Sequence, residues 1–131
     1  MPILAEILIP KLKGRFADRG LRTASSPSPC AVFPAGYPEF GDIQIYDDGD
    51  ELTVVAGNFT HGHFSNYDEA LSVQQKAEAI TDAVLQFLEQ VFADEVVFWG
   101  SHEAAVGWHK RGEFSEWHRG AKEYAWSGPI L

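Results

Sequence analysis

One amphipathic helical segment, residues 72–92, constrains the fold of this chain more than any other feature. Its start matches a capping box, because Ser72 can cap the helix while Gln75 reaches back to the backbone of Ser72. Apolar residues then recur at intervals of three and four, which predicts one buried face. That face consists of Val73, Ala77, Ile80, Val84, Phe87, Leu88 and Val91. A helix of this kind must pack against a sheet or another helix.

A three-stranded antiparallel meander is predicted over residues 42–64. Two segments rich in β-branched residues, 43–46 and 52–55, flank the sequence Asp47-Asp48-Gly49-Asp50. Its Asp-Gly pair tolerates positive φ and is a strong hairpin signal. The turn-prone pair Gly57-Asn58 then leads into the third strand. The meander supplies the surface that the helix needs.

Further elements are predicted on both sides of this centre. Residues 3–20 have roughly helical apolar spacing, and Pro10 predicts a kink or a break in that helix. Residues 30–33 predict a short strand. The segment 96–99 is apolar on both faces, which predicts a covered central strand with residues 105–109 as its partner.

These elements together predict a single α+β domain over residues 1–131. We expect an antiparallel sheet of about five to six strands, with the helix 72–92 on one face and an N-terminal helix. The tail places Phe114, Trp117, Ala121 and Tyr124 at near-helical intervals, which predicts a helix that Gly120 weakens.

The net charge of −9 is concentrated in the middle of the chain. Residues 1–22 hold five bases and two acids, and residues 110–131 hold four bases and three acids. Residues 23–109 hold fourteen acids and one base, Lys76, which makes −13. Such a block repels nucleic acid phosphates and favours a basic protein partner, whose association it accelerates. The alternative is that the acidity serves solubility alone.

The sequence predicts a cytoplasmic protein with no membrane contact. The apolar stretch from Ile3 to Ile9 is interrupted by Glu6 and ended by Pro10, far short of the roughly 20 residues that cross a bilayer. No signal peptide pattern is present. A single cysteine, Cys30, cannot form an internal disulfide, which is consistent with a reducing compartment.

The pair His61 and His63 is the strongest metal-ligand pattern. Residues two apart on a strand point to the same face, so the two imidazoles can bind one zinc or similar ion. A third ligand would come from His102, His109, His118 or Glu103. The alternative is that both rings hydrogen-bond to neighbouring groups, and it leads us to expect no cofactor.

Enzymatic motifs are otherwise missing, so we do not favour an enzyme. The sequence has no G-x-S-x-G, P-loop or G-x-G-x-x-G. Cys30 has no neighbouring base or cation to activate it, so we interpret it as a buried structural thiol. Trp108 and Trp117 stand among basic residues near the C-terminus and belong to a residue type enriched at binding hot spots, although they equally suit a core.

The segments Phe33-Pro34-Ala35, Gly41-Asp42-Ile43, Asp48-Gly49-Asp50 and Thr60-His61-Gly62-His63-Phe64 carry a resemblance to a known family. With them, the chain from about residue 30 to residue 109 resembles a family of small uncharacterised bacterial proteins. That resemblance implies no catalytic residue. In size, acidity and α+β composition the chain is also similar to immunity proteins encoded beside polymorphic toxins.

Three functions follow as hypotheses. The leading one is a non-enzymatic binding protein that neutralises a basic, toxin-like partner. Its predicted partner-binding residues are Asp47, Asp48, Asp50, Glu51, Trp108 and Trp117. The second is a small metal-dependent enzyme that uses His61 and His63. The third is a structural module that forms homodimers through its C-terminal aromatic residues.

Overall fold

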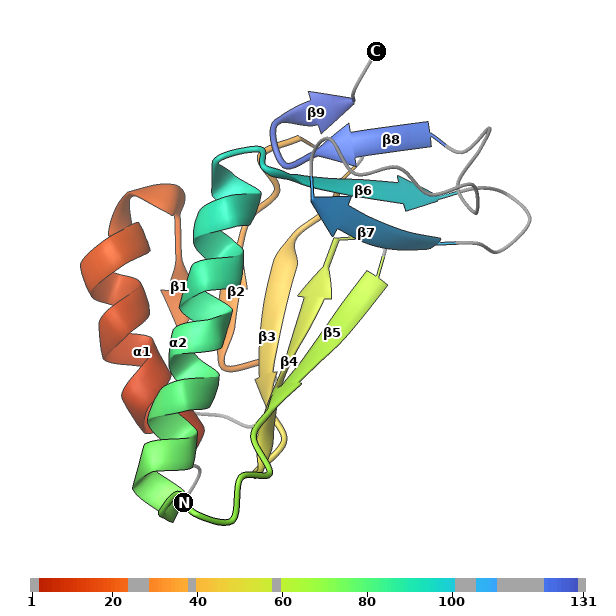
Figure 1. Cartoon of the computed structure of the whole chain (residues 1–131). Coiled ribbons are helices and arrows are strands. Elements are labelled where there is room, and N and C mark those ends of the chain that lie inside the picture. The colour runs from red at the N-terminus through yellow and green to blue at the C-terminus, as the bar shows by residue number, and fades with distance from the viewer. Residues whose placement is uncertain are drawn as a thin grey trace.

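The computed structural model describes residues 3–23, 29–37, 40–57, 60–100, 106–110 and 122–129 (Figure 1). Its arrangement is α+β, as the sequence predicts. In chain order the elements are α1 (Ile3–Phe16), the 3-10 helix η1 (Ala17–Arg19), β1 (Arg22–Thr23), β2 (Ala31–Phe33), β3 (Ile43–Asp47), β4 (Glu51–Ala56), β5 (Thr60–Ser65), α2 (Val73–Phe92), β6 (Val96–Gly100), β7 (Val106–Lys110), β8 (Lys122–Ala125) and β9 (Gly128–Pro129).

The first five strands form one antiparallel sheet in the order β1-β2-β3-β4-β5. Its β3-β4-β5 part is the predicted meander, which is thereby confirmed. Gly49 in the first turn has φ 98° and Gly57 in the second has φ 55°, positive values that glycine adopts readily. Helices α1 and α2 lie side by side and cover one face of this sheet (Figure 1).

The C-terminal strands form a second antiparallel sheet in the order β7-β6-β8-β9. β6 lies between β7 and β8, and its residues Val96, Val97 and Phe98 are buried, which confirms a covered strand with a following partner. The five-stranded sheet matches the expected antiparallel sheet, and the C-terminal strands add a second sheet of four strands. The second sheet includes the pairing of Phe98 with Tyr124, a long-range contact that local sequence patterns do not specify.

Residue 124 belongs to strand β8, so the helix predicted from the tail spacing is wrong there. Residues 114, 117 and 121, the other positions of that pattern, lie outside the described residues. After β8 the chain turns through Trp126, which is 6% exposed and packs edge-on against Phe40 and Phe92. Burial of this aromatic ring in the main core fixes the turn between β8 and β9 to the rest of the molecule.

Helix α2 begins as predicted. The Ser72 hydroxyl accepts a hydrogen bond from the backbone N–H of Gln75 at 3.1 Å, and the Gln75 side chain accepts one from the backbone N–H of Ser72 at 2.9 Å. The apolar stripe from Ala77 to Val91 is buried, but Val73 is 69% exposed. Val73 is the first residue of the helix and lines a pocket at this end of the molecule.

Helix α1 is one continuous helix from residue 3 to residue 16, so the break predicted at Pro10 is wrong. Pro10 lies on the exposed side, where water can hydrogen-bond to the carbonyl left without its N–H donor. The buried face carries Leu4, Leu8, Leu12 and Phe16. Neither helix in the described part of the chain is long and apolar enough to cross a membrane.

Candidate functional site

The turn between β3 and β4 gathers the predicted acidic residues at one end of the first sheet. The backbone N–H of Asp48 donates to the carbonyl of Glu51 at 3.0 Å and closes the turn. Gly49 takes the positive φ that the Asp-Gly pair predicts. Asp48 and Asp50 are exposed, and Glu51 is partly buried.

Asp47 differs from the other three acids because its carboxylate is used within the fold. One oxygen accepts a hydrogen bond from the backbone N–H of Ala5 in helix α1 at 2.9 Å. The other accepts from the backbone N–H of Gly49 at 2.9 Å. Asp47 therefore links α1 to the turn, and each of its two carboxylate oxygens already accepts a hydrogen bond within the fold.

Three side chains from consecutive parts of the meander meet beside this turn. Asp48 follows β3, Glu51 begins β4, and His63 lies in β5. One potential ligand atom of each lies within 4.8 Å of the other two. Nδ1 of His63 is 3.4 Å from a carboxylate oxygen of Glu51. We call these three residues the Asp48–Glu51–His63 cluster.

Thr53 of β4 contacts two members of the cluster, Asp48 and His63. It lies directly opposite His63 in the β4-β5 register. Its hydroxyl donates to the Asp48 carboxylate, and its oxygen lies 3.0 Å from Nδ1 of His63. Because Thr53 is only 8% exposed, its hydroxyl depends on these two partners for its hydrogen bonds.

The structure places His61 and His63 on the same exposed face, as the strand period predicts. Their rings pack edge to face with centroids 5.1 Å apart. The cluster of potential ligands among the described residues contains His63 but not His61. Two of its members, Asp48 and Glu51, were expected to be docking residues rather than metal ligands.

None of the four expected third ligands has a described side chain. His102, Glu103 and His118 lie outside the described residues, and only the backbone of His109 is described, in β7. The sequence does not signal these neighbours by itself, since a two-residue turn at Gly57-Asn58 would pair residue 53 with residue 62, whereas the structure pairs residue 53 with residue 63. That register brings the start of β4 beside the histidines.

The positively charged N-terminal helix neutralises part of the acidic block. Lys11 of α1 pairs with Asp82 of α2 at 3.1 Å, and Arg15 pairs with Glu89 at 2.7 Å. In the described part of the chain, by contrast, no lysine or arginine makes an ion pair with the carboxylates of the β3-β4 turn. Asp48, Asp50 and Glu51 are therefore three carboxylates of this turn without a lysine or arginine ion pair in the described part of the chain.

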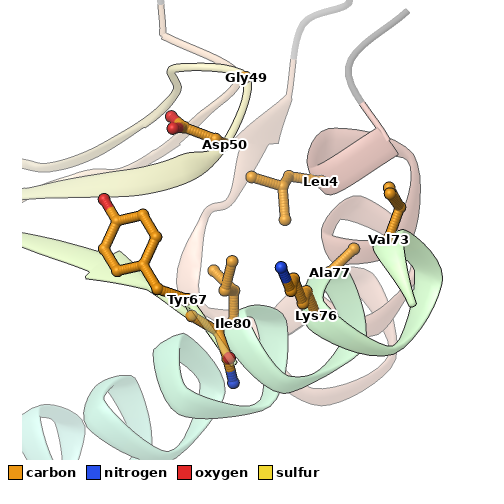
Figure 2. A pocket seen from close by; sticks show the side chains of 9 residues that line it. Leu4, Gly49, Asp50, Tyr67, Val73, Lys76, Ala77 and Ile80 are labelled. Atoms are coloured by element: carbon orange, nitrogen blue, oxygen red, sulfur yellow. The ribbon is translucent and has the colours of Figure 1, made fainter. Parts of the chain in front are cut away.

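A pocket of about 330 Å³ adjoins the same turn (Figure 2). Leu4, Ala77 and Ile80 supply apolar walls from the two helices, and Asp50 and Lys76 bring opposite charges to it from the turn and from α2 (Figure 2). Gly49, Asn66, Tyr67 and Val73 complete the lining. Tyr67 is 73% exposed and Val73 69%, so the rim of the pocket presents two large apolar side chains to solvent.

Of the remaining sequence-predicted groups, Cys30 has a described side chain. Cys30 is buried, and burial, followed by the nearby charge of Asp47, raises the pKa of its thiol from 9.0 to about 11, which suits a structural thiol. Trp117 lies outside the described residues, and of Trp108 only the backbone, in β7, is described. The chain matches no family model, no curated protein and no solved structure.

Proposed function

We propose that this protein is a non-enzymatic binding protein that docks a basic protein partner at the β3-β4 turn. The observation that carries the proposal is the contrast between two groups of acids. Asp82 and Glu89 on α2 are each paired with a base of α1. Asp48, Asp50 and Glu51 have no such pair among the described residues. Charge left uncompensated at one end of a molecule attracts and orients an oppositely charged partner.

The neighbouring pocket supports the proposal because steering charges alone do not hold a partner. Buried apolar and aromatic contacts provide most of the binding energy at protein interfaces. Exposed Tyr67 and Val73 form such a surface around the apolar wall of Leu4 and Ile80. Asp50 and Lys76 bring opposite charges to the pocket and its walls are apolar, so the partner would insert an apolar side chain there and direct its bases to the exposed carboxylates.

In its concrete form the proposal is an immunity protein that neutralises a basic toxin encoded beside it. The similarity in size, acidity and α+β composition supports this form. An immunity protein must capture its toxin quickly, and electrostatic steering raises association rates by roughly 10- to 1000-fold over an uncharged encounter.

The test measures association with the protein encoded next to this chain's gene. The variant Asp48→Asn/Asp50→Asn/Glu51→Gln removes three charges from the turn. The matched control Asp18→Asn/Glu89→Gln/Glu95→Gln removes three charges from outside the turn, namely from η1, from the last part of α2 and from the segment between α2 and β6. We expect the first variant to lower the association rate constant at least about tenfold in low salt, and the control to leave it close to the wild-type value.

The salt dependence provides a second criterion. The wild-type association rate should fall steeply with ionic strength, and that slope should flatten in the turn variant alone. Equal rates and equal slopes for both variants would contradict docking at the turn. A parallel measurement with Tyr67→Ala should increase the dissociation rate and leave the association rate almost unchanged.

A further inference from the structure

The Asp48–Glu51–His63 cluster combines two kinds of metal ligand on one exposed face. Two carboxylates and one imidazole form a mixed oxygen and nitrogen ligand set. Carboxylates alone suit magnesium and calcium, whereas imidazole suits zinc, iron, nickel and copper. The presence of His63 therefore distinguishes this cluster from an ordinary group of surface acids.

The distances in the cluster are close to those that one ion requires. Nitrogen and oxygen ligands of zinc lie about 2.0–2.2 Å from the ion in a tetrahedral arrangement, so two of them are about 3.3–3.6 Å apart. The potential ligand atoms here lie within 4.8 Å of one another, and Nδ1 of His63 is 3.4 Å from a carboxylate oxygen of Glu51. The His63 side chain is 51% exposed and Asp48 is exposed as well, so an ion can reach both from solvent.

Thr53 provides the outer hydrogen bonds that such sites use. Ligating side chains are usually held by a second layer of hydrogen-bonding groups, which orients them toward the ion. The buried Thr53 hydroxyl contacts both Asp48 and His63 from strand β4. It thereby fixes two ligands that come from different segments of the chain.

From these observations we infer that Asp48, Glu51 and His63 bind a divalent transition-metal ion of the zinc or manganese class. Three protein ligands on an exposed surface leave at least one coordination position for water or for a ligand from another molecule. The inference does not rest on the proposed basic partner, because it concerns the isolated protein.

The test is isothermal titration of the chelator-treated full chain with Zn²⁺ and, separately, with Mn²⁺. We expect one ion per chain for at least one of the two metals. His63→Ala and Asp48→Asn should each lower that affinity at least about tenfold, and Thr53→Val should lower it by about tenfold through loss of the outer hydrogen bonds. Thermal melting of each variant shows that it is folded before it is titrated.

Two matched variants serve as controls. Asp50→Asn removes a carboxylate from the same turn that is not part of the cluster, and His61→Ala removes the neighbouring imidazole. Both should retain the wild-type affinity. Binding of Zn²⁺ at the cluster should also shift the NMR signals of the His63 ring. A diffuse attraction of ions to the acidic surface would not shift these signals.

Three results would overturn the inference: no stoichiometric binding of either metal, an unchanged affinity in His63→Ala, or an equal affinity for Ca²⁺ that survives His63→Ala. The outcome is separable from that of the docking proposal. His63→Ala removes the metal site without removing an acid, whereas Asp50→Asn weakens docking and leaves the metal site complete.

Discussion

The carboxylate of Asp47 accepts a hydrogen bond from the backbone N–H of Ala5, 2.9 Å away and 42 positions earlier in the chain. Ala5 lies in the first turn of α1, where backbone N–H groups have no partner within the helix. A negatively charged acceptor there also interacts favourably with the helix dipole. The hairpin thus supplies from a distance the cap that this helix needs.

We expect Asp47→Ala to lower the free energy of unfolding by about 1–2 kcal/mol, because it removes the acceptor of both Ala5 and Gly49. Chemical denaturation measures the loss. Asp50→Ala is the matched control in the same turn, and its exposed carboxylate should contribute little. Equal losses in the two variants would show that the hydrogen bond to α1 does not stabilise the fold.

Thr81 offers a stabilising substitution. Its side-chain oxygen is fully buried in α2 and has no hydrogen-bond partner among the described residues. Thr81→Val keeps the shape of the side chain and removes the unsatisfied group, so it should stabilise the protein by about 1 kcal/mol in thermal or urea unfolding. Thr53→Val, which removes a hydroxyl that is hydrogen-bonded, should instead destabilise it. A loss of stability in Thr81→Val would argue against this interpretation of the buried hydroxyl.

Gly57 is required by a close approach as well as by its positive φ. A Cβ atom at this position would lie 1.9 Å from the carbonyl oxygen of Phe40. We expect Gly57→Ala to destabilise the protein by about 2–4 kcal/mol, measured by urea unfolding. Gly49→Ala is the control that measures the backbone strain alone. Its φ is also positive, but a Cβ atom there would meet nothing within 4 Å. Its cost should be about 1 kcal/mol, and the same cost for both would exclude the collision as the cause.

The buried thiol of Cys30 gives stability a specific pH dependence. Because the folded state raises its pKa from 9.0 to about 11, the folded state holds the proton more tightly than the unfolded chain does. The contribution is complete below about pH 9 and is lost as the pH rises toward about 11, by about 1–2 kcal/mol. Cys30→Ala should lack this loss, while both proteins share the titration of all other groups.

Urea unfolding of wild type and Cys30→Ala at about pH 8 and about pH 10.5 measures the difference. Parallel pH profiles for the two proteins would be incompatible with a thiol held neutral by burial. The same burial should make the wild-type thiol react with a disulfide reagent only after denaturant is added.

The candidate site was only partly predictable from sequence. The Asp-Gly turn and the shared face of His61 and His63 follow from local patterns. The meeting of His63 with Asp48 and Glu51 depends on the register between β4 and β5, in which Thr53 pairs with His63. A shift of one residue in that register would move the histidines to the other face of the sheet.

By itself the sequence determined those elements whose signals span only a few residues. The capping box at Ser72, the turn at Gly49 and the buried stripe of α2 follow from the hydrogen-bonding capacity and hydrophobic period of neighbouring residues. Tertiary structure alone decided that the strands divide into two sheets and that Asp47 caps α1 while Asp48 joins His63. These contacts join distant segments, and their geometry depends on how the whole core packs, which no short stretch of sequence encodes.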